Sequence, residues 1–332
     1  MNEQKKYLSY WIRRFLLEYI ICIKNLSKNT QLSYRDAFKL LIPFMSKKEK
    51  KKPEVLLVED LTPDSITSFL SSLEINRKCS VSTRNQRLAA IYALSRFIAQ
   101  NCPEYVEWCR LIHTVPAKKS PGTIITCLEK DEMDALMAAP DPNNRQGKRD
   151  YALLLFLYNT GARADEAAGL KISGLHLDKQ TVCLHVKGDK QRFCPLWKST
   201  VNELKALIKD RDSGDNVFKN RHNQPLTRFG IYTIVEKYAT KAAKSKPLMA
   251  EKRVSPHTIR HTTATHLLQS GVDINTIRAW LGHVSINTTN IYAEINLKMK
   301  SEALACCEIK GIKKSSHWKD DKKIMDFLDG LK

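Results

Sequence analysis

Between positions 255 and 292, residues that start and stop helices alternate with residues that can bind and attack phosphate. Ser255, with a proline after it at the first helical position, is a good N-cap, so a helix is expected to begin there. Gly271 is expected to end that helix, Asp273 to cap a second one, and Gly282 to end the second. The residues of this stretch that can bind phosphate are therefore expected to lie at successive helix ends.

Four of these side chains have the chemistry needed to hold and attack a phosphodiester. His257 and Arg260 are three residues apart and share one face near the positive end of the first helix. His283 follows the second helix, and Tyr292 lies in a short third one. An arginine fork matches phosphate geometry, and histidine moves protons near neutral pH. A tyrosine phenol, in contrast, attacks only when cationic neighbours activate it.

Two stretches earlier in the chain supply a second arginine and a lysine. Arg163 follows a Thr-Gly pair at the end of an apolar helix, and Glu166 beside it is expected to steady its guanidinium. Residues 181–186 alternate between apolar and polar side chains and a Gly-Asp turn follows, so a β-hairpin is expected with Lys187 near its turn. By spacing alone, Lys190 is a rival of Lys187 for the same role.

Taken in order, these motifs resemble the pattern of the tyrosine recombinases, the phage integrase family. The match runs from Thr-Gly-x-Arg-x-x-Glu through the hairpin lysine, His-x-x-Arg and Leu-Gly-His to a tyrosine nine residues after the last of these histidines. It covers most of the chain, and the shared order is far more specific than any single motif. The resemblance favours Lys187 over Lys190 and implies six active-site residues: Arg163, Lys187, His257, Arg260, His283 and Tyr292.

The resemblance also implies a reaction. Tyr292 is expected to attack the scissile phosphate, forming a 3′-phosphotyrosine and freeing a 5′-hydroxyl, while Arg163 and Arg260 stabilise the developing charge. Lys187 is expected to protonate the leaving oxygen and His257 to assist proton transfer, and the remaining histidine of the six to hydrogen-bond the phosphate. Because the phosphotyrosine keeps the bond energy, no ATP, other cofactor or metal is expected.

The helical periodicity of the chain predicts a mainly α fold with one small β-hairpin or sheet. The resemblance implies a helical core-binding domain of the SAM-like type in residues 1–115. Residues 116–122, rich in proline and lysine, are expected to form a linker. Residues 123–310 are expected to form an α+β catalytic domain. In residues 311–332 a C-terminal tail helix carries an apolar stripe, for which an inter-protomer contact is expected.

The fourth helix of the N-terminal region is expected to begin near position 80. Its first turns carry Arg84, Asn85 and Arg87. A helix that enters the major groove places its base-reading side chains there, so these three residues are predicted to contact DNA. The alternative is an ordinary solvated helix face.

The charge of the chain limits the class of partner. Its 332 residues carry a net charge of +20, which indicates nucleic acid or an anionic membrane. The longest apolar run, residues 151–158, is far shorter than the roughly 20 residues of a membrane span. Double-stranded DNA is therefore the expected partner, and no membrane. Nine scattered cysteines without a Cys-x-x-Cys pair, and no evident signal peptide, favour a cytoplasmic protein.

The lysine-rich residues 47–52 are expected to form a loop, either solvated or in contact with phosphate. They follow Pro43, which is expected to end the second helix because proline has no backbone N–H.

Several biological roles remain open from the residues. The resemblance implies a homotetramer on two recombination sites, with partner recombinases from the same element as a further option. Integration or excision of a mobile element is expected, and resolution of chromosome or plasmid dimers is the alternative. A type IB topoisomerase and a non-catalytic DNA-binding regulator of the same fold are the other candidates. A zinc site at His257 and His261 is disfavoured, because Thr258 stands where the zinc motif has glutamate.

Overall fold

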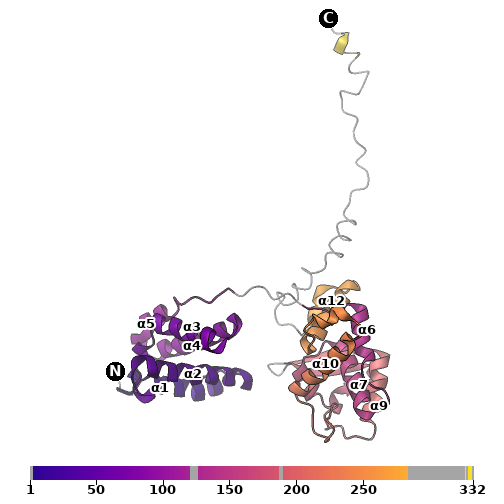
Figure 1. The fold of residues 1–332 in the computed structure, drawn as a ribbon, viewed down its shortest axis with the longest axis horizontal. Helices are drawn as coiled ribbons and strands as arrows, with labels where there is room; N and C mark the ends of the chain where they lie inside the picture. The colour runs from indigo at the N-terminus through magenta and orange to yellow at the C-terminus, as the bar shows by residue number, and fades with distance from the viewer. Residues whose placement is uncertain (1–2, 120–125, 187–189, 283–325, 327, 331–332) are drawn as a thin grey trace. The chain divides into compact units, whose positions relative to one another are not determined.

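The computed structural model (Figure 1) describes residues 3–119, 126–186, 190–282, 326 and 328–330. The chain divides into two compact units, Met1–Thr123 and Ile124–Lys332. Each unit has its own hydrophobic core. The described chain is mainly helical with one three-stranded antiparallel sheet, which confirms the predicted fold class. No helix in the described ranges is both long and apolar enough to cross a membrane.

The N-terminal unit is built from helices. The longer ones are α1 Leu8–Arg14, the π-helical η2 Phe15–Ile23, α2 Lys28–Glu49, α3 Pro63–Arg77, α4 Val81–Asn101 and α5 Val106–Ile112. Single 3-10 turns complete the unit: η1 Glu3–Lys6, η3 Pro53–Val55, η4 Val58–Asp60 and η5 Pro103–Tyr105. Phe15 lies at the centre of the core, where its ring contacts those of Tyr34, Phe38 and Phe97. These aromatic contacts join η2, α2 and α4 into one bundle.

The expected end of the second helix at Pro43 is wrong. Helix α2 continues through Pro43 to Glu49 and ends at Lys50, whose φ of 52° is left-handed. A proline inside a helix costs about 3 kcal/mol, since one hydrogen bond is lost and the ring crowds the preceding turn. Leu41 and Met45 flank it and are both fully buried. Burying each such side chain contributes about 1.5–3 kcal/mol, which offsets that cost. The first part of the expected loop at residues 47–52 is consequently helical.

The second unit, Ile124–Lys332, is called the catalytic unit below after the domain predicted there. It surrounds helix α7, Arg145–Thr160, whose second half is entirely buried. The other helices are α6 Lys130–Ala138, α8 Ala164–Gly169, α9 Lys198–Ile208, α10 Arg228–Ala243, α11 Pro247–Ala250, α12 Pro256–Gln269 and α13 Ile274–Leu281. Helices α6, α9 and α12 pack against α7, as Figure 1 shows. This packing is expected from the sequence of α7, because its last nine residues are almost all apolar.

The small sheet has the order β1-β2-β3, with β1 Leu175–His176, β2 Thr181–Val186 and β3 Lys190–Pro195. The 3-10 turns η6 Ile172–Gly174 and η7 Leu177–Lys179 lie beside β1. Strands β2 and β3 pair antiparallel with Leu184 opposite Arg192, so the two predicted strands of the hairpin are confirmed. The turn with Lys187 lies outside the described residues.

The predicted helix ends between positions 255 and 282 are also confirmed. Ser255 caps α12 through its hydroxyl, which accepts a hydrogen bond from the Thr258 N–H. Asp273 caps α13 in the same manner. Gly271 and Gly282 follow the two helices with left-handed φ values of 83° and 64°. Local backbone rules therefore place the C-terminal ends of both helices correctly.

Candidate active site

Three helix ends from distant parts of the chain meet in the catalytic unit: the ends of α7 and α13 and the first turns of α12. Gly161 ends α7 with a left-handed φ of 58°, and a Cβ added there would lie only 2.5 Å from Cδ2 of Leu281. The Arg260 side chain lies against the same glycine. The Thr-Gly pair thus has a physical reason, because only glycine allows this turn and this close approach.

Arg163 begins helix α8 next to this meeting point. Its Nη1 donates to Oε1 of Glu166 at 2.6 Å, and its backbone N–H donates to Oε2 at 3.0 Å. The Arg163 side chain is 39% exposed, whereas that of Glu166 is 5% exposed. Glu166 therefore steadies the arginine from the protein side, as the sequence predicts, and leaves the guanidinium accessible to a phosphate.

Glu166 remains ionised in its buried position. Burial alone raises its pKa, but the positive charge of Arg192 and the hydrogen bonds from Arg163 outweigh that effect, so the pKa lies below its usual value. A charged carboxylate is required here, because a neutral one would hold the two guanidiniums far less strongly.

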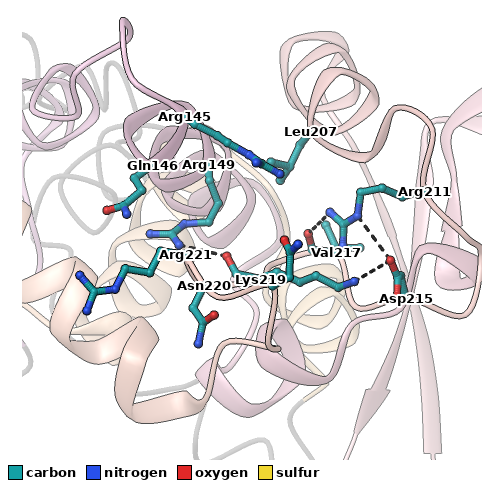
Figure 2. A pocket seen from close by; sticks show the side chains of 11 residues that line it. Arg145, Gln146, Arg149, Leu207, Arg211, Asp215, Val217, Lys219, Asn220 and Arg221 are labelled. Atoms are coloured by element: carbon teal, nitrogen blue, oxygen red, sulfur yellow. Dashed lines mark hydrogen bonds and ion pairs between the residues drawn. The ribbon is translucent and has the colours of Figure 1, made fainter.

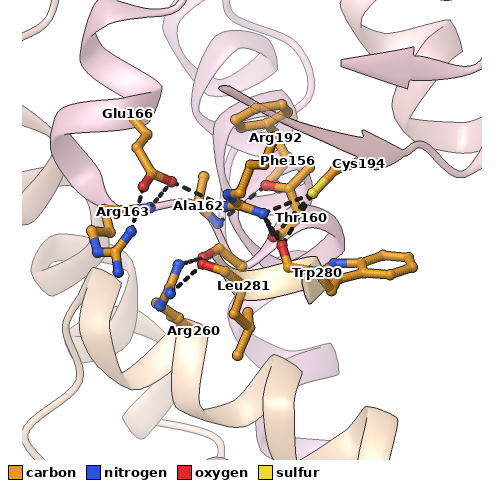
Figure 3. A network of polar contacts seen from close by, with 11 residues as sticks. Phe156, Thr160, Ala162, Arg163, Glu166, Arg192, Cys194, Arg260, Trp280 and Leu281 are labelled. Atoms are coloured by element: carbon orange, nitrogen blue, oxygen red, sulfur yellow. Dashed lines mark hydrogen bonds and ion pairs between the residues drawn. The ribbon is translucent and has the colours of Figure 1, made fainter. Parts of the chain in front are cut away.

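Arg260 is 1% exposed and ties the three helix ends together (Figure 3). Its Nη1 donates to the carbonyl of Gly161 and its Nη2 to the carbonyl of Leu281, both at 2.6 Å. The degree of burial was not expected, and contact of Arg260 with the reacting phosphate stays a prediction. In this conformation the guanidinium orders the ends of α7 and α13.

His257 lies one turn before Arg260 on α12, and its ring is 4.9 Å from that of His261. Burial lowers the pKa of His257, and the charges of Arg260 and Arg163 lower it further. Burial is also the main cause that lowers the pKa of His261, to about 4. Both imidazoles are therefore neutral at pH 7, and His257 is able to accept a proton beside the two arginines.

Three of the six expected active-site residues lie outside the described residues: Lys187, His283 and Tyr292. Their roles stay predictions. The described chain reaches within one residue of two of them, at Val186 and Gly282.

Arg192 is a residue of this site that the sequence analysis missed. It lies on β3 and is 7% exposed. Its Nη2 contacts Oε2 of Glu166 at 3.0 Å, and its Nη1 donates to the carbonyls of Thr160, at 3.4 Å, and Trp280. One guanidinium therefore connects the hairpin, the carboxylate behind Arg163 and the ends of α7 and α13 (Figure 3).

A signal for Arg192 was present in the strand pattern. Val182, Leu184 and Cys194 are buried on one face of the hairpin, and Arg192 is opposite Leu184 in the register. An arginine on the inward face of a strand needs a buried acceptor. The pattern could have identified the position, but not its partners, which are far along the sequence.

Arg84 and Asn85, which are predicted to contact DNA, make hydrogen bonds within the N-terminal unit. Arg84 is 5% exposed, and its Nη1 donates to the Pro116 carbonyl at 3.2 Å. The Asn85 amide makes two hydrogen bonds with the backbone of Lys118, at 2.8 and 3.0 Å. Lys118 also pairs with Glu74 at 2.7 Å. Arg84 is therefore buried, and residues 116–118 of the expected linker are attached to α4. Contact of Arg84 and Asn85 with DNA stays a prediction.

Arg87 is half-buried and donates to the carbonyl of Ser33 at 3.0 Å. Gln86 donates to the hydroxyl of the same serine at 2.8 Å. These contacts join the start of α4 to the start of α2. Contact of Arg87 with DNA stays a prediction.

Two family models match this chain. The Phage integrase family matches residues 126–299, and the Phage integrase N-terminal SAM-like domain matches residues 11–101. The provisionally named integrase/recombinase y4rC of Sinorhizobium fredii is 36% identical over 324 residues, covering 96% of this chain and 97% of the relative. Tyrosine recombinase XerD of Chlorobaculum tepidum is 31% identical over 291 residues, covering 84% of this chain and 90% of the relative.

Two solved structures share the fold. The Tn1549 transposon integrase, in complex with circular intermediate DNA, has a TM-score of 0.67 at 16% identity and covers 89% of this chain and 99% of its own. XerH recombinase, bound to a palindromic difH substrate, has a TM-score of 0.65 at 20% identity and covers 93% of this chain and 98% of its own. At these identities the likeness concerns the fold alone.

Proposed function

Since this chain belongs to the phage integrase family, and is thus a site-specific recombinase that cleaves and rejoins DNA, we propose that Tyr292 is its nucleophile. We further propose that Arg163 and Arg260 bind the scissile phosphate. The observation that supports this assignment most is the meeting of the ends of α7 and α13 with the first turns of α12, since it brings both arginines and His257 to one place.

In the first step the phenol oxygen of Tyr292 attacks phosphorus, and the bond to the 5′-oxygen breaks. The products are a 3′-phosphotyrosine and a 5′-hydroxyl. The exposed guanidinium of Arg163 is held in place by Glu166, so it stabilises the charge on the non-bridging oxygens without reorganising. Neutral His257 accepts a proton near the attacking phenol, Lys187 protonates the leaving 5′-oxygen, and His283 hydrogen-bonds the phosphate.

In the second step a 5′-hydroxyl from the partner strand attacks the phosphotyrosine and releases Tyr292. One phosphodiester replaces another, so the overall bond energy changes little and the proposed reaction uses no ATP. Exchange between two sites needs four cleavages, and we therefore propose a homotetramer on two double-stranded recombination sites in the cytoplasm. The similar structures of Tn1549 integrase and XerH, both bound to DNA, support the DNA partner. Docking of residues 311–332 on a neighbouring protomer belongs to the same proposal.

For the biological role we propose integration or excision of a mobile element. The integrase/recombinase y4rC, which is similar along nearly its whole length, supports this role. Resolution of chromosome or plasmid dimers is the second candidate, and the XerD relatives support it. The DNA flanking the gene discriminates between them, because a mobile element has inverted repeats around a short spacer at its ends.

The nucleophile is tested with a nicked suicide substrate, which loses its 5′-fragment after cleavage and traps the covalent complex. Wild-type protein should give a protein–DNA band that resists denaturant, and Tyr292→Phe should give none while it still shifts the same DNA. Tyr151→Phe, which changes a half-buried tyrosine of α7, is the matched control and should trap DNA normally. A covalent band with Tyr292→Phe would assign the attack to another residue.

A further inference from the structure

A cavity of about 470 Å³ lies at the start of α7, the end opposite to Gly161 and Arg163 (Figure 2). Because α7 has 16 residues, its two ends are about 24 Å apart. The cavity is therefore separate from the active site. It is lined by the first turns of α7, the end of α9 and the loop that joins α9 to α10: Arg145, Gln146, Arg149, Leu207, Arg211, Asp215, Val217, Lys219, Asn220, Arg221 and Asn223.

Charge in this cavity is strongly unbalanced. Five of the lining side chains are cationic, while Asp215 is the single carboxylate of the lining. Asp150 behind the wall neutralises one cation, since it pairs with Arg149 at 2.5 Å. Asp215 is shared between Arg211, at 3.6 Å, and Lys219, at 2.6 Å. Five cations against two carboxylates leave an excess of three positive charges.

The inner cations are already fixed in place. Arg149 donates to the carbonyl of Lys219 and Arg211 to the carbonyl of Val217, both at 3.0 Å. The side chains of Arg149, Arg211 and Lys219 are only 12%, 20% and 21% exposed. Binding an anion here would not require these side chains to lose further rotamer freedom, which is a large part of the usual cost of binding.

Two arginines that line the cavity, Arg145 and Arg221, are exposed to solvent. Arg145 lies beside Leu207 and Arg221 beside Asn220, as Figure 2 shows. Within the described residues no carboxylate pairs with either of them. Arginine forks bind phosphate oxygens well, and amide groups of Asn220 and Asn223 add neutral donors. The lining therefore fits a multiply charged phosphate rather than an apolar or cationic ligand.

We propose that this cavity is a second phosphate site, which holds the DNA backbone outside the reacting base pairs. The inference rests on the proposed function. Phosphates of one strand repeat about every 3.4 Å along a duplex, so a backbone phosphate about 24 Å from the scissile one is roughly seven base pairs away. The contact adds affinity without reading sequence.

The test compares the full-length double variant Arg145→Gln/Arg221→Gln with wild type on half-sites of increasing length. The matched control is Lys179→Gln/Lys244→Gln, which removes the same charge from exposed positions of the same unit outside the cavity. On half-sites that extend well beyond roughly seven base pairs, we expect binding about tenfold weaker and a salt slope smaller by about 1 to 2, since each phosphate contact contributes about 0.9. On half-sites that end before that point, the variant should equal wild type.

Sodium tripolyphosphate, tested by thermal shift, distinguishes the two sources of phosphate. If the variant binds all DNA lengths like wild type but loses stabilisation by tripolyphosphate, the cavity serves a small polyphosphate and the DNA assignment is wrong. If neither DNA binding nor the thermal shift differs from wild type, the site itself is wrong. Suicide-substrate trapping on a short half-site tests the proposed nucleophile independently of the cavity. Failure of wild type to trap contradicts the proposed nucleophile and leaves the binding comparison intact.

Discussion

At the start of α4 in the N-terminal unit and at the start of α8 in the catalytic unit, an arginine interacts with a glutamate. The first of these arginines is buried and the second is accessible to solvent. In each, a glutamate lies between two cations: Glu74 near Arg84 and Lys118, and Glu166 between Arg163 and Arg192. In the N-terminal unit, Arg84 is the buried cation, and Lys118 belongs to the expected linker. In the catalytic unit, Arg192 occupies the buried position and Arg163 stays accessible, with 39% of its side chain exposed.

This difference shows that a cation near a helix start does not determine its own role. The role of the cation depends on which buried groups accept hydrogen bonds from its N–H donors. Arg84 donates a hydrogen bond to the carbonyl of Pro116, so this arginine attaches the segment around Pro116 to α4. Arg192 donates to Oε2 of Glu166, the oxygen on its buried side. The other oxygen, Oε1, accepts from Arg163 and orients that guanidinium toward solvent.

The largest effect is expected for Arg192→Met. This change leaves the buried carboxylate of Glu166 without its inner partner, and breaking a buried pair in this way costs about 3–5 kcal/mol. Chemical denaturation should show this loss in the unfolding free energy of the catalytic unit, together with slower cleavage. Arg192→Lys keeps the charge but not the bridging geometry, so its unfolding free energy should lie between those of wild type and Arg192→Met. A loss below about 1 kcal/mol for Arg192→Met would mean that the network does not support the site.

A direct contrast between Arg163→Ala and Arg84→Ala comes next. Arg163→Ala should slow cleavage by about 10²–10³-fold, because it removes a charge from the transition state, and should alter half-site binding far less. Arg84→Ala should instead lower the unfolding free energy of the N-terminal unit by about 1–3 kcal/mol, through lost hydrogen bonds of a buried charge. Single-turnover cleavage and denaturation of both variants provide the comparison. Changed base preference in Arg84→Ala without loss of stability would instead support its predicted role in DNA reading.

A smaller effect concerns pH. Burial lowers the pKa of His257, His261 and His266 in the catalytic unit, that of His261 to about 4, whereas His113 alone has a lowered pKa in the N-terminal unit. An unfolded histidine takes up a proton near pH 6.5 and these folded ones do not. Folding stability should therefore be unaffected above pH 6.5 and fall as the pH drops toward 4.

The catalytic unit should lose more stability than the N-terminal unit over that range, since it has three such histidines. Urea titrations at pH 7.5, 6 and 5 measure the slope for each unfolding transition. His261→Gln should make the slope of the catalytic transition shallower. An unchanged slope in that variant would show that His261 titrates normally in the folded protein.

Features set by neighbouring residues were predictable from the sequence, and features set by distant partners were not. Ser255, Gly271 and Gly282 determine helix ends through their own backbone and side chain, and the structure confirms all three. The distant acceptors of Arg192, in Glu166 and Trp280, lie 26 and 88 residues away along the chain. The Pro116 carbonyl lies 32 residues from Arg84, so no local pattern identifies these partners. The same reason explains why the grouping of Arg145 with residues 211–223 was not foreseen.

Pro43 shows a local rule outweighed by packing. The rule that proline ends a helix is a statement about backbone hydrogen bonds, and it is correct in isolation. Leu41 and Met45 pack on the same core on either side of the proline, and this burial is a tertiary property. Predictions from local rules should thus be least certain where a breaker residue lies within a strong apolar stripe.

The identity of the nucleophile is the central claim, and mapping the trapped DNA to a peptide tests it most directly. Trypsin cleaves after Arg278 and Lys298, and the peptide between them contains Tyr292 as its single tyrosine. After nuclease digestion of a wild-type complex trapped on the suicide substrate, mass spectrometry should find the nucleotide adduct on residues 279–298, with fragment ions that place it on Tyr292. An adduct on any other peptide, or on another residue of this one, would contradict the account.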